Sequence, residues 1–413
     1  MKKMEITKKQ IEQIRNQYGD SFYLLDTKQF KNNYRELLSA LRMYYDSANI
    51  SYSYKTNYIP RLCKIVDEFG GYAEVVSDME VELAKRIGVE RHKIILNGPY
   101  KKKETIIELI QNGGTVNIDS LYDFSIIETL AMNSPGQKYQ FGIRCNYDVE
   151  DGRLSRFGFD IEGEDFLYVI NRVKEIKNLK IKGFHCHFAA RNIKCWEKRV
   201  EGMLSVIDTY FDGVPEYISV GGGIYGKMAD SLKEQFSEYI PTYDEYAKVI
   251  GTPFQKRYGD MPVDCKPQLF VEPGSALAGD VMFFAAPVIS MKSIRGKDIA
   301  TLLGSVYNIN PTLNGKNSPL KIISYGGKQK EYDNLDMGGY TCIESDYLYK
   351  GFRGKCAVGD YVVFGNVGSY SIVLKPPFIL PNFPIIEIME NDSDIRLIKV
   401  NEQFDDIFHT YKF

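Results

Sequence analysis

From residue 48 to residue 271, short apolar runs alternate with longer segments whose apolar residues recur at helical spacing. The eight runs that predict strands are 48–54, 72–76, 93–96, 115–118, 139–144, 181–186, 216–220 and 268–271. Helices are predicted between them, for example over 79–87, 103–111, 120–130, 165–176, 200–210 and 233–246. Strands that alternate with helices form a parallel sheet with crossover connections. Eight such units in roughly 230 residues predict a closed (β/α)8 (TIM) barrel, with an open doubly wound sheet as the alternative.

The segments on either side of this alternation differ from it. Residues 1–20 predict a basic helix, residues 22–26 form a short apolar run, and residues 27–45 have helical spacing. Beyond residue 280, Gly, Pro and Asn turns separate short strand-like runs at 281–289, 298–303, 320–323, 361–364, 371–373 and 385–389. We therefore predict an N-terminal segment (1–26) of undecided packing, a barrel domain (27–280) and a mainly antiparallel C-terminal β domain (281–413).

Composition and charge exclude several classes of protein. The 413 residues carry a formal net charge of -2, which offers no electrostatic footprint for nucleic acid or an anionic membrane. No apolar run approaches the length of a membrane span, and the charged first residues lack the apolar core of a signal peptide. Seven cysteines, odd in number and irregularly spaced, predict no disulfide framework and indicate a reducing cytoplasm.

Polar residues follow each of the eight predicted strands. In a barrel these positions share one face, and that face carries the chemistry. They are Lys55, Ser77 with Glu80, Asn97 with Gly98, Asp119, Arg144, His185-Cys186-His187, Gly221-Gly222-Gly223 and Glu272-Pro273-Gly274. A desolvated lysine such as Lys55 can lose its proton and attack an aldehyde as an amine. The alternative is an ordinary solvated surface lysine.

The glycine run Gly221-Gly222-Gly223 follows the seventh strand. Backbone N–H groups without side chains can approach an anion closely, and the loops after strands seven and eight are the usual phosphate site of barrels. The run also matches the dinucleotide pattern GxGxxG, which requires an acid at the end of the next strand about 20 residues on. The acid near that distance, Glu245, lies in a helical pattern instead. The context therefore favours a phosphate site over a dinucleotide site.

His185 and His187 alternate about Cys186 and therefore point the same way from the sixth strand. They could form a metal-binding pair, pack as core histidines, or stack an imidazole on an aromatic cofactor. No third ligand is placed nearby, so the metal site ranks last of the three.

Glu272 leaves the eighth strand into a Pro-Gly turn. A buried carboxylate costs free energy unless it meets a cation. A protonated pyridine nitrogen would satisfy Glu272 and would be kept protonated by it, which makes the ring an electron sink for a carbanion. Arg144 could pair with the same carboxylate and orient it.

Taken together, these motifs resemble the fold-type III pyridoxal-phosphate decarboxylases, which include the diaminopimelate, ornithine and arginine decarboxylases. The likeness spans nearly the whole chain and rests on Lys55 in Tyr-Lys-Thr-Asn, the two histidines, Gly221–Gly223, Glu272-Pro273-Gly274, Cys342 with Asp346, and Gly368-Ser369-Tyr370. It implies an alanine-racemase-like barrel with a C-terminal β domain, the cofactor pyridoxal 5'-phosphate, a small amino-acid substrate, and a homodimer with active sites at its interface.

The resemblance also implies a role for each matching residue. Lys55 would form the Schiff base, His187 would stack on the ring, and Glu272 would hold the ring nitrogen. Cys342 of the partner subunit would protonate Cα after CO₂ leaves. The remaining cofactor-binding residues would be Gly221, Gly222, Gly223, Gly274, Ser275, Tyr370 and Arg144, and the substrate-binding residues would be Asn310, Glu344 and Asp346.

The chain departs from the family pattern at four places. Ala189-Ala190 replaces a Gly-Ser, and Ser275 replaces an arginine, so two phosphate-binding side chains are missing. Ile343 stands where an acid usually follows the cysteine, and Asn310-Pro311 replaces Arg-Pro. The last two changes remove groups that grip the far end of a diamino acid in the family. They favour a modified or conjugated amino acid, as in siderophore or secondary-metabolite pathways, over free diaminopimelate or another diamino acid.

Three other functions remain as alternatives. An amino-acid racemase of the same fold would carry an arginine at the ring nitrogen, which Glu272 opposes. A catalytically dead regulatory binder would be expected to lose the lysine or the cysteine, and both remain. A nicotinamide oxidoreductase that relied on GxGxxG would leave Lys55 without a role.

Overall fold

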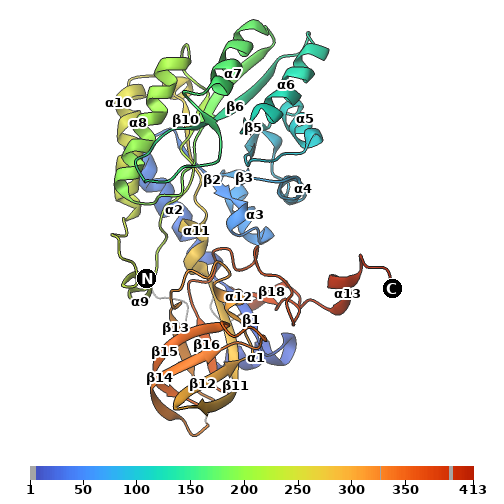
Figure 1. Cartoon of the computed structure of the whole chain (residues 1–413), viewed down its shortest axis with the longest axis vertical. Coiled ribbons are helices and arrows are strands. Elements are labelled where there is room, and N and C mark those ends of the chain that lie inside the picture. The colour runs from blue at the N-terminus through green and yellow to red at the C-terminus, as the bar shows by residue number, and fades with distance from the viewer. Residues whose placement is uncertain (1–5, 326, 390–393) are drawn as a thin grey trace. The chain divides into compact units, whose positions relative to one another are not determined.

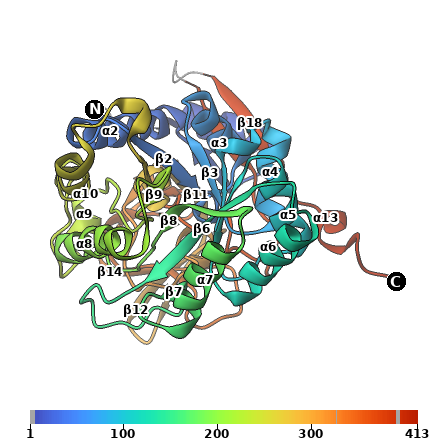
Figure 2. The ribbon, with the colours of Figure 1, turned by 90° about the horizontal axis from the view of Figure 1, so that it is seen from above.

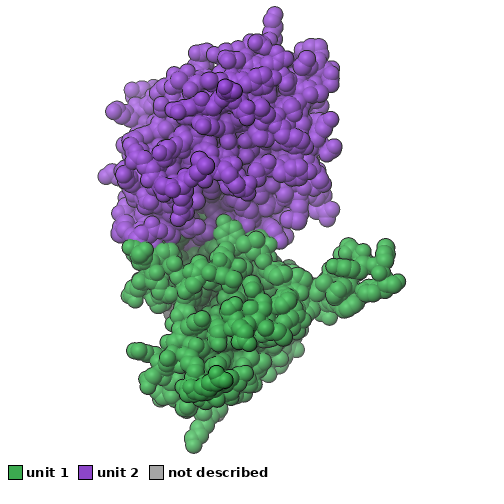
Figure 3. All heavy atoms as spheres, viewed as in Figure 1, with its two compact units in different colours: residues 1–31, 226–237, 277–413 green, residues 32–225, 238–276 purple. Residues whose placement is uncertain are grey.

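A computed structural model describes residues 6–325, 327–389 and 394–413 of the chain (Figure 1). The chain divides into two compact units (Figure 3). The first comprises residues 1–31, 226–237 and 277–413, and the second comprises residues 32–225 and 238–276.

The second unit contains a closed barrel of eight parallel strands, as predicted. The strands are β2 (Ala48–Ser53), β3 (Tyr72–Val75), β4 (Ile94–Leu96), β5 (Thr115–Ile118), β6 (Tyr139–Asn146), β8 (Leu179–His185), β9 (Tyr217–Ser219) and β10 (Gln268–Val271). Pairing of β10 with β2 and of β5 with β6 closes the ring, which excludes the open sheet. A two-residue strand, β7 (Phe159–Asp160), adds to β6.

Helices surround the barrel strands (Figure 2). They are α2 (Thr27–Tyr44), α3 (Pro60–Glu68), α4 (Asp78–Ile87), α5 (Lys103–Gln111), α6 (Leu121–Asn133), α7 (Glu164–Glu175), α8 (Ile193–Tyr210) and α10 (Tyr243–Tyr258). Their boundaries follow local capping chemistry. The Ser77 side chain accepts a hydrogen bond from the N–H of Glu80 at the start of α4, and Gly88 ends that helix in the left-handed conformation.

Two helix predictions were wrong at their starts. The helix predicted over 233–246 begins only at Tyr243, as α10, and α9 (Asp230–Lys233) ends where the predicted helix was expected to begin. Pro241 disfavours a helical residue before it, and a capping box of Thr242 and Glu245 starts α10 afresh. Helix α8 begins at Ile193 rather than at residue 200, since the Asn192 side chain caps it.

The first unit is built on a nine-stranded sheet. Its strands are β1 (Phe22–Leu25), β11 (Met282–Ile294), β12 (Lys297–Leu302), β13 (Leu320–Ile323), β14 (Lys330–Gly338), β15 (Tyr347–Cys356), β16 (Tyr361–Phe364), β17 (Ile385–Ile388) and β18 (Ile395–Lys399). Most pairs are antiparallel, but β1–β17 and β12–β14 are parallel. Helices of this unit include α1 (Lys8–Tyr18), α9, α12 (Val306–Ile309) and α13 (Phe404–Phe408).

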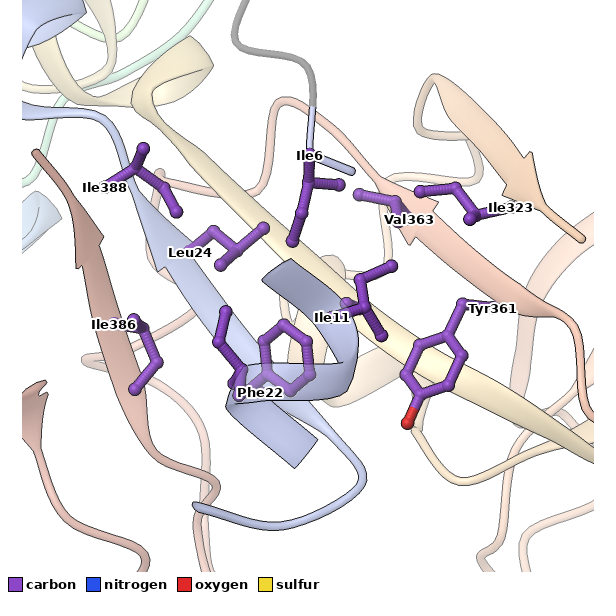
Figure 4. Close-up of a cluster of buried hydrophobic side chains, with 11 residues drawn as sticks. Ile6, Ile11, Phe22, Leu24, Ile323, Tyr361, Val363, Ile386 and Ile388 are labelled. Atoms are coloured by element: carbon purple, nitrogen blue, oxygen red, sulfur yellow. The ribbon is translucent and has the colours of Figure 1, made fainter. Parts of the chain in front are cut away.

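The N-terminal segment, whose packing the sequence left open, is part of this sheet. Strand β1 pairs with β11 on one side and β17 on the other. Helix α1 buries Ile11 and Ile14 against Phe22, Tyr361 and Ile386 (Figure 4). Residues between Ile6 and Leu24 therefore share a hydrophobic core with strands more than 250 residues later.

Several strands of this unit were missed or misplaced by the sequence. Strands β14 and β15 form a largely exposed hairpin, so they lack the apolar run that marks a buried strand, and β18 is likewise only partly buried. The predicted strand over 371–373 is a turn that follows Tyr370, whose φ of 65° is left-handed. Among the residues that the structure describes, no helix has the length and hydrophobicity needed to cross a bilayer.

Candidate active site

Lys55 lies just beyond β2, in a short 3-10 turn at Tyr54–Thr56. Its Nζ lies 2.7 Å from Oε1 and 2.5 Å from Oε2 of Glu74 on β3. The Glu74 side chain is fully buried, whereas 33% of the Lys55 side chain is exposed. Ser53 also donates a hydrogen bond to Glu74. Lys55 is therefore held at the barrel mouth by a buried carboxylate, unlike a solvated surface lysine.

Glu272 is buried at the end of β10, with 1% of its surface exposed. It accepts hydrogen bonds from the Ser219 hydroxyl at 2.8 Å and from the Asn97 amide at 3.0 Å. The Nε2 of His185 is 3.3 Å from its Oε2, and Nδ1 of His187 is 3.6 Å away. Burial opposes ionisation, but His185 and Lys55 keep the pKa of Glu272 well below its ordinary value. The site therefore contains a buried carboxylate that stays charged.

One amide links the two carboxylates. The Nδ2 of Asn97 donates to Oε1 of Glu74 at 3.1 Å and to Oε1 of Glu272 at 3.0 Å. The Oδ1 of Asn97 accepts from Asn117, which accepts in turn from the Tyr217 hydroxyl. This buried network connects the Lys55 ion pair to Glu272 and fixes the spacing between them.

The proposed pairing of Arg144 with Glu272 was wrong. Arg144 donates to Oδ2 of Asp119 at 3.0 Å and to the backbone oxygen of His187 at 3.3 Å, and it covers the Phe157 ring at 4.7 Å. Both Arg144 and Asp119 were expected at strand ends. Because their strands, β6 and β5, are neighbours in the ring, Arg144 pairs with Asp119 instead of Glu272.

His187 presents a neutral imidazole at the site. Burial lowers its pKa to about 4, and Lys55 and Arg144 contribute while Glu272 opposes them. The N–H of Gly222 donates to Nδ1 at 3.1 Å, so the ring proton is assigned to Nε2. About 29% of the side chain is exposed, which is compatible with stacking on a ring. Within the described residues, no group of three or more His, Cys, Asp or Glu side chains could hold a metal ion.

The glycine loop after β9 is tightly packed. A Cβ at Gly221 would overlap the Cys186 carbonyl oxygen, and one at Gly222 would overlap that of Glu272. The N–H groups of Gly221 and Gly222 already donate to the Ser219 hydroxyl at 3.4 Å and to the His187 ring at 3.1 Å. No helix opens at this loop, since α9 begins only at Asp230, so the structural context of a dinucleotide motif is absent there.

The turn after β10 contacts the turn that carries Lys55. The N–H of Ser53 donates to the Pro273 carbonyl at 3.3 Å, and a Cβ at Gly274 would overlap the Thr56 hydroxyl. Ser275 follows at the start of α11 (Ser275–Ala278) and is half-buried. The glycine at 274 is thus required for the close approach of the first and last barrel strands.

Five predicted residues lie in the other unit. Cys342 and Glu344 are exposed, and Asn310 and Tyr370 are half-buried. Asp346 is buried and accepts from Ser305, from the N–H of Val306 and from the Thr341 hydroxyl, so both its oxygens are engaged. Asp346 thereby holds the turn beside Cys342. The catalytic role of Cys342, the cofactor-binding role of Tyr370 and the substrate-binding roles of the other three residues stay predictions.

Sequence reasoning missed three residues of the barrel site: Glu74, Ser219 and Arg199. Glu74 and Ser219 lie within the apolar strands β3 and β9, where an isolated polar residue signals an inward-facing role. Arg199 lies on α8 and is fully buried, but one arginine in a charged helix offers no such signal.

Comparison with known proteins identifies the family. The profile of the pyridoxal-dependent decarboxylase, pyridoxal binding domain, matches residues 28–279. The chain belongs to this family. A diaminopimelate decarboxylase from Aquifex aeolicus is 23% identical over 96% of this chain and 92% of its own length. The L-glutamyl-[BtrI acyl-carrier protein] decarboxylase from Niallia circulans is 24% identical over 98% of this chain and 97% of its own.

Solved structures agree on the fold. The crystal structure of diaminopimelate decarboxylase from M. jannaschii superimposes with a TM-score of 0.84, covers 97% of this chain and 94% of its own, and is 21% identical. This decarboxylase chain is accordingly a pyridoxal-phosphate-dependent carboxy-lyase that acts on an amino acid. Its barrel residues fit the cofactor: a partly exposed lysine, a buried ionised carboxylate and a neutral imidazole meet at one mouth.

Proposed function

We propose that this decarboxylase removes the α-carboxylate from a modified or conjugated amino acid. The observation that carries the proposal is the pair of changes at Asn310-Pro311 and Ile343-Glu344. They replace an arginine and an acid that the family pattern places at the far end of a diamino acid. The relative from Niallia circulans, named for a glutamyl group on a carrier protein, supports a conjugated substrate.

In this proposal the barrel residues hold the cofactor. Lys55 would bind its aldehyde carbon, Glu272 would keep a proton on the ring nitrogen, and His187 would cover the ring face. When bound, pyridoxal phosphate supplies an electron sink for the charge that develops at the substrate's Cα. Because Glu272 is buried and ionised, its interaction with a cationic ring nitrogen is strong and poorly screened.

Two further residues would position or protonate the reacting groups. Glu74 holds the Lys55 Nζ in place through contacts of 2.7 and 2.5 Å. Cys342 of the partner subunit delivers a proton to Cα after CO₂ leaves, which requires the homodimer that the family resemblance implies. Gly274, Ser275 and the Gly221–Gly223 loop would complete the barrel's part of the cofactor site. We further propose a cytoplasmic location, supported by seven cysteines that are all free thiols.

Diaminopimelate is the second candidate substrate. Relatives from Aquifex aeolicus, Archaeoglobus fulgidus and Staphylococcus aureus, among others, bear the name diaminopimelate decarboxylase. These relatives favour a free diamino acid, whereas the substitutions at Asn310 and Ile343 oppose it. The two candidates differ in what occupies the far end of the substrate.

A substrate panel separates the two candidates. CO₂ release is measured from free meso-diaminopimelate, ornithine and arginine, and from glutamate and diamino acids acylated or joined by a thioester to a carrier protein. We expect turnover on a conjugated member of the panel and little on the free diamino acids. High turnover on free meso-diaminopimelate would sink the proposal. Lys55→Ala is the control, and it should lose both CO₂ release and the imine absorbance band.

A second variant tests whether the two substitutions set specificity. Asn310→Arg combined with Ile343→Glu restores the family's groups, and it should raise kcat/KM for a free diamino acid at least about tenfold. Thr312→Arg adds the same charge at an exposed position two residues away and should not. An unchanged preference in the double variant would separate these residues from substrate choice.

A further inference from the structure

Two side chains that usually bind the cofactor's phosphate are absent from this chain, where Ala190 and Ser275 stand in their places. Beneath the loops that should hold the phosphate lies Arg199, a fully buried residue of α8. We propose that Arg199 is a positioning residue for the cofactor's phosphate, and that its charge and hydrogen bonds offset the missing side chains. The inference depends on the cofactor and not on the substrate proposed above.

Arg199 binds backbone carbonyl groups from two loops at once. Its Nη1 donates to Gly222 at 2.6 Å and to Val220 at 3.2 Å, both in the loop after β9. Its Nη2 donates to Phe188 at 3.0 Å and to Ala190 at 3.1 Å, both in the loop after β8. One guanidinium therefore fixes the conformation of both loops.

Trp196, one turn earlier on α8, extends this arrangement. Its indole N–H donates to the Gly223 carbonyl at 3.3 Å, and the Arg199 guanidinium stacks over its ring at 3.8 Å. The guanidinium also lies directly below the loop, since a Cβ at Gly223 would be 3.7 Å from Nη2. The two side chains thus hold five carbonyl groups on the α8 side of the loops.

The orientation of these carbonyls determines where the loop N–H groups point. In a trans peptide the N–H of the next residue faces away from the carbonyl. The N–H groups of Gly223 and Ile224 therefore face away from α8, as do those of Ala189 and Arg191 after the held carbonyls of Phe188 and Ala190. Backbone N–H groups with a common orientation form an anion-binding site.

The charge on Arg199 adds to this effect. Among the residues that the structure describes, no carboxylate forms an ion pair with Arg199, and its Nε has no hydrogen-bond partner. Carbonyl oxygens satisfy its donors but do not neutralise its charge. The buried carboxylate of Glu272 acts on this charge from a distance. A buried cation with no carboxylate in contact with it still favours an anion nearby. A phosphate on the far side of the glycine loop would supply that anion.

The test compares two ligands on the cofactor-free protein. Calorimetry measures the Kd of pyridoxal phosphate and of pyridoxal, which lacks the phosphate. The affinity ratio is the Kd of pyridoxal divided by the Kd of pyridoxal phosphate, and it isolates the phosphate's contribution to binding. Arg199→Met should reduce this ratio at least about tenfold while changing pyridoxal affinity little. Arg199→Lys should reduce it less, because lysine keeps the charge but lacks the planar fork. Inorganic phosphate should compete with pyridoxal phosphate less well in both variants.

Lys198→Met is the matched control. Lys198 is the neighbouring residue of the same helix, is 38% exposed and pairs with Glu150, so its loss changes net charge equally without touching the loops. Its affinity ratio should equal that of the wild type. A wild-type ratio in Arg199→Met, or an equal fall in Lys198→Met, would overturn the proposal, as would a parallel loss of affinity for both ligands.

Trp196→Phe tests the role of the held carbonyl groups if Arg199→Met does not fold. This variant keeps an aromatic ring next to the guanidinium but removes the N–H that holds the Gly223 carbonyl. We expect a severalfold fall in the affinity ratio, and an unchanged ratio would refute the role of the held carbonyls. Because no substrate is used, a negative result here leaves the proposed decarboxylation untouched.

Discussion

Glu80 provides a stability test of the site's electrostatics that needs no cofactor. It lies in the first turn of α4, is only 4% exposed, and accepts a hydrogen bond from the N–H of Val76 at 2.8 Å. Burial raises its pKa from 4.5 to about 7; the nearby charge of Glu74 adds to this, while Val76 and Lys55 oppose it. The carboxyl group thus changes charge near neutral pH, close to the Lys55–Glu74 pair.

The raised pKa has a defined sign and size. Well below pH 4.5, Glu80 is protonated in both the folded and the unfolded state, so its stabilising contribution is fully present. As the pH rises from 4.5 to 7, the unfolded chain releases the proton freely while the folded protein retains it, and stability is lost. The loss by pH 8 is about 3 kcal/mol. Glu80→Gln keeps an oxygen acceptor for Val76 but cannot ionise, so it should not show this loss.

Urea unfolding of the cofactor-free protein at pH 5 and pH 8 measures the difference. The unfolding free energy of Glu80→Gln minus that of the wild type should rise by about 2.5 kcal/mol between the two pH values, because part of the loss has already occurred at pH 5. Taking this difference removes the contributions of all other titrating groups. Glu82→Gln, two residues along α4, is the control, because Glu82 is 48% exposed and pairs with Arg86 at 2.9 Å. A pH-independent difference for Glu80→Gln would refute the reasoning.

Two further variants test the geometry around Glu272. Glu272→Gln keeps an oxygen for its neighbours but cannot hold a proton on the ring nitrogen, so kcat for CO₂ release should fall on the order of 100-fold or more with the cofactor still bound; a wild-type kcat would contradict the assignment. Gly222→Ala places a methyl group against the Glu272 carbonyl and 3.2 Å from Cε1 of His187. It should lower the free energy of unfolding by about 1–3 kcal/mol and weaken cofactor binding. Gly136→Ala, in open space, should change stability by less than about 0.5 kcal/mol, and equal effects of the two alanines would count against close packing of the loop.

Exposure separates the strands that the sequence predicts from those that it misses. The eight barrel strands are almost entirely buried, so each appears as a continuous apolar run of the expected length. The hairpin of β14 and β15 is mostly exposed, and its polar sequence resembles a loop. Burial depends on what covers a strand, which is a property of the whole fold.

Position along the chain determined the candidate residues of this protein, whereas tertiary structure determined their partners. Lys55 and Glu272 could be selected from the sequence because parallel strands with helical crossovers place all strand ends on one face. The pairing of Arg144 with Asp119 rather than Glu272 depends on which strand ends are neighbours in the closed ring. The link from Glu74 through Asn97 to Glu272 and the reach of Arg199 from α8 to two loops depend equally on distances across the barrel. A one-dimensional pattern carries no such distances, because they arise only when the ring of strands closes.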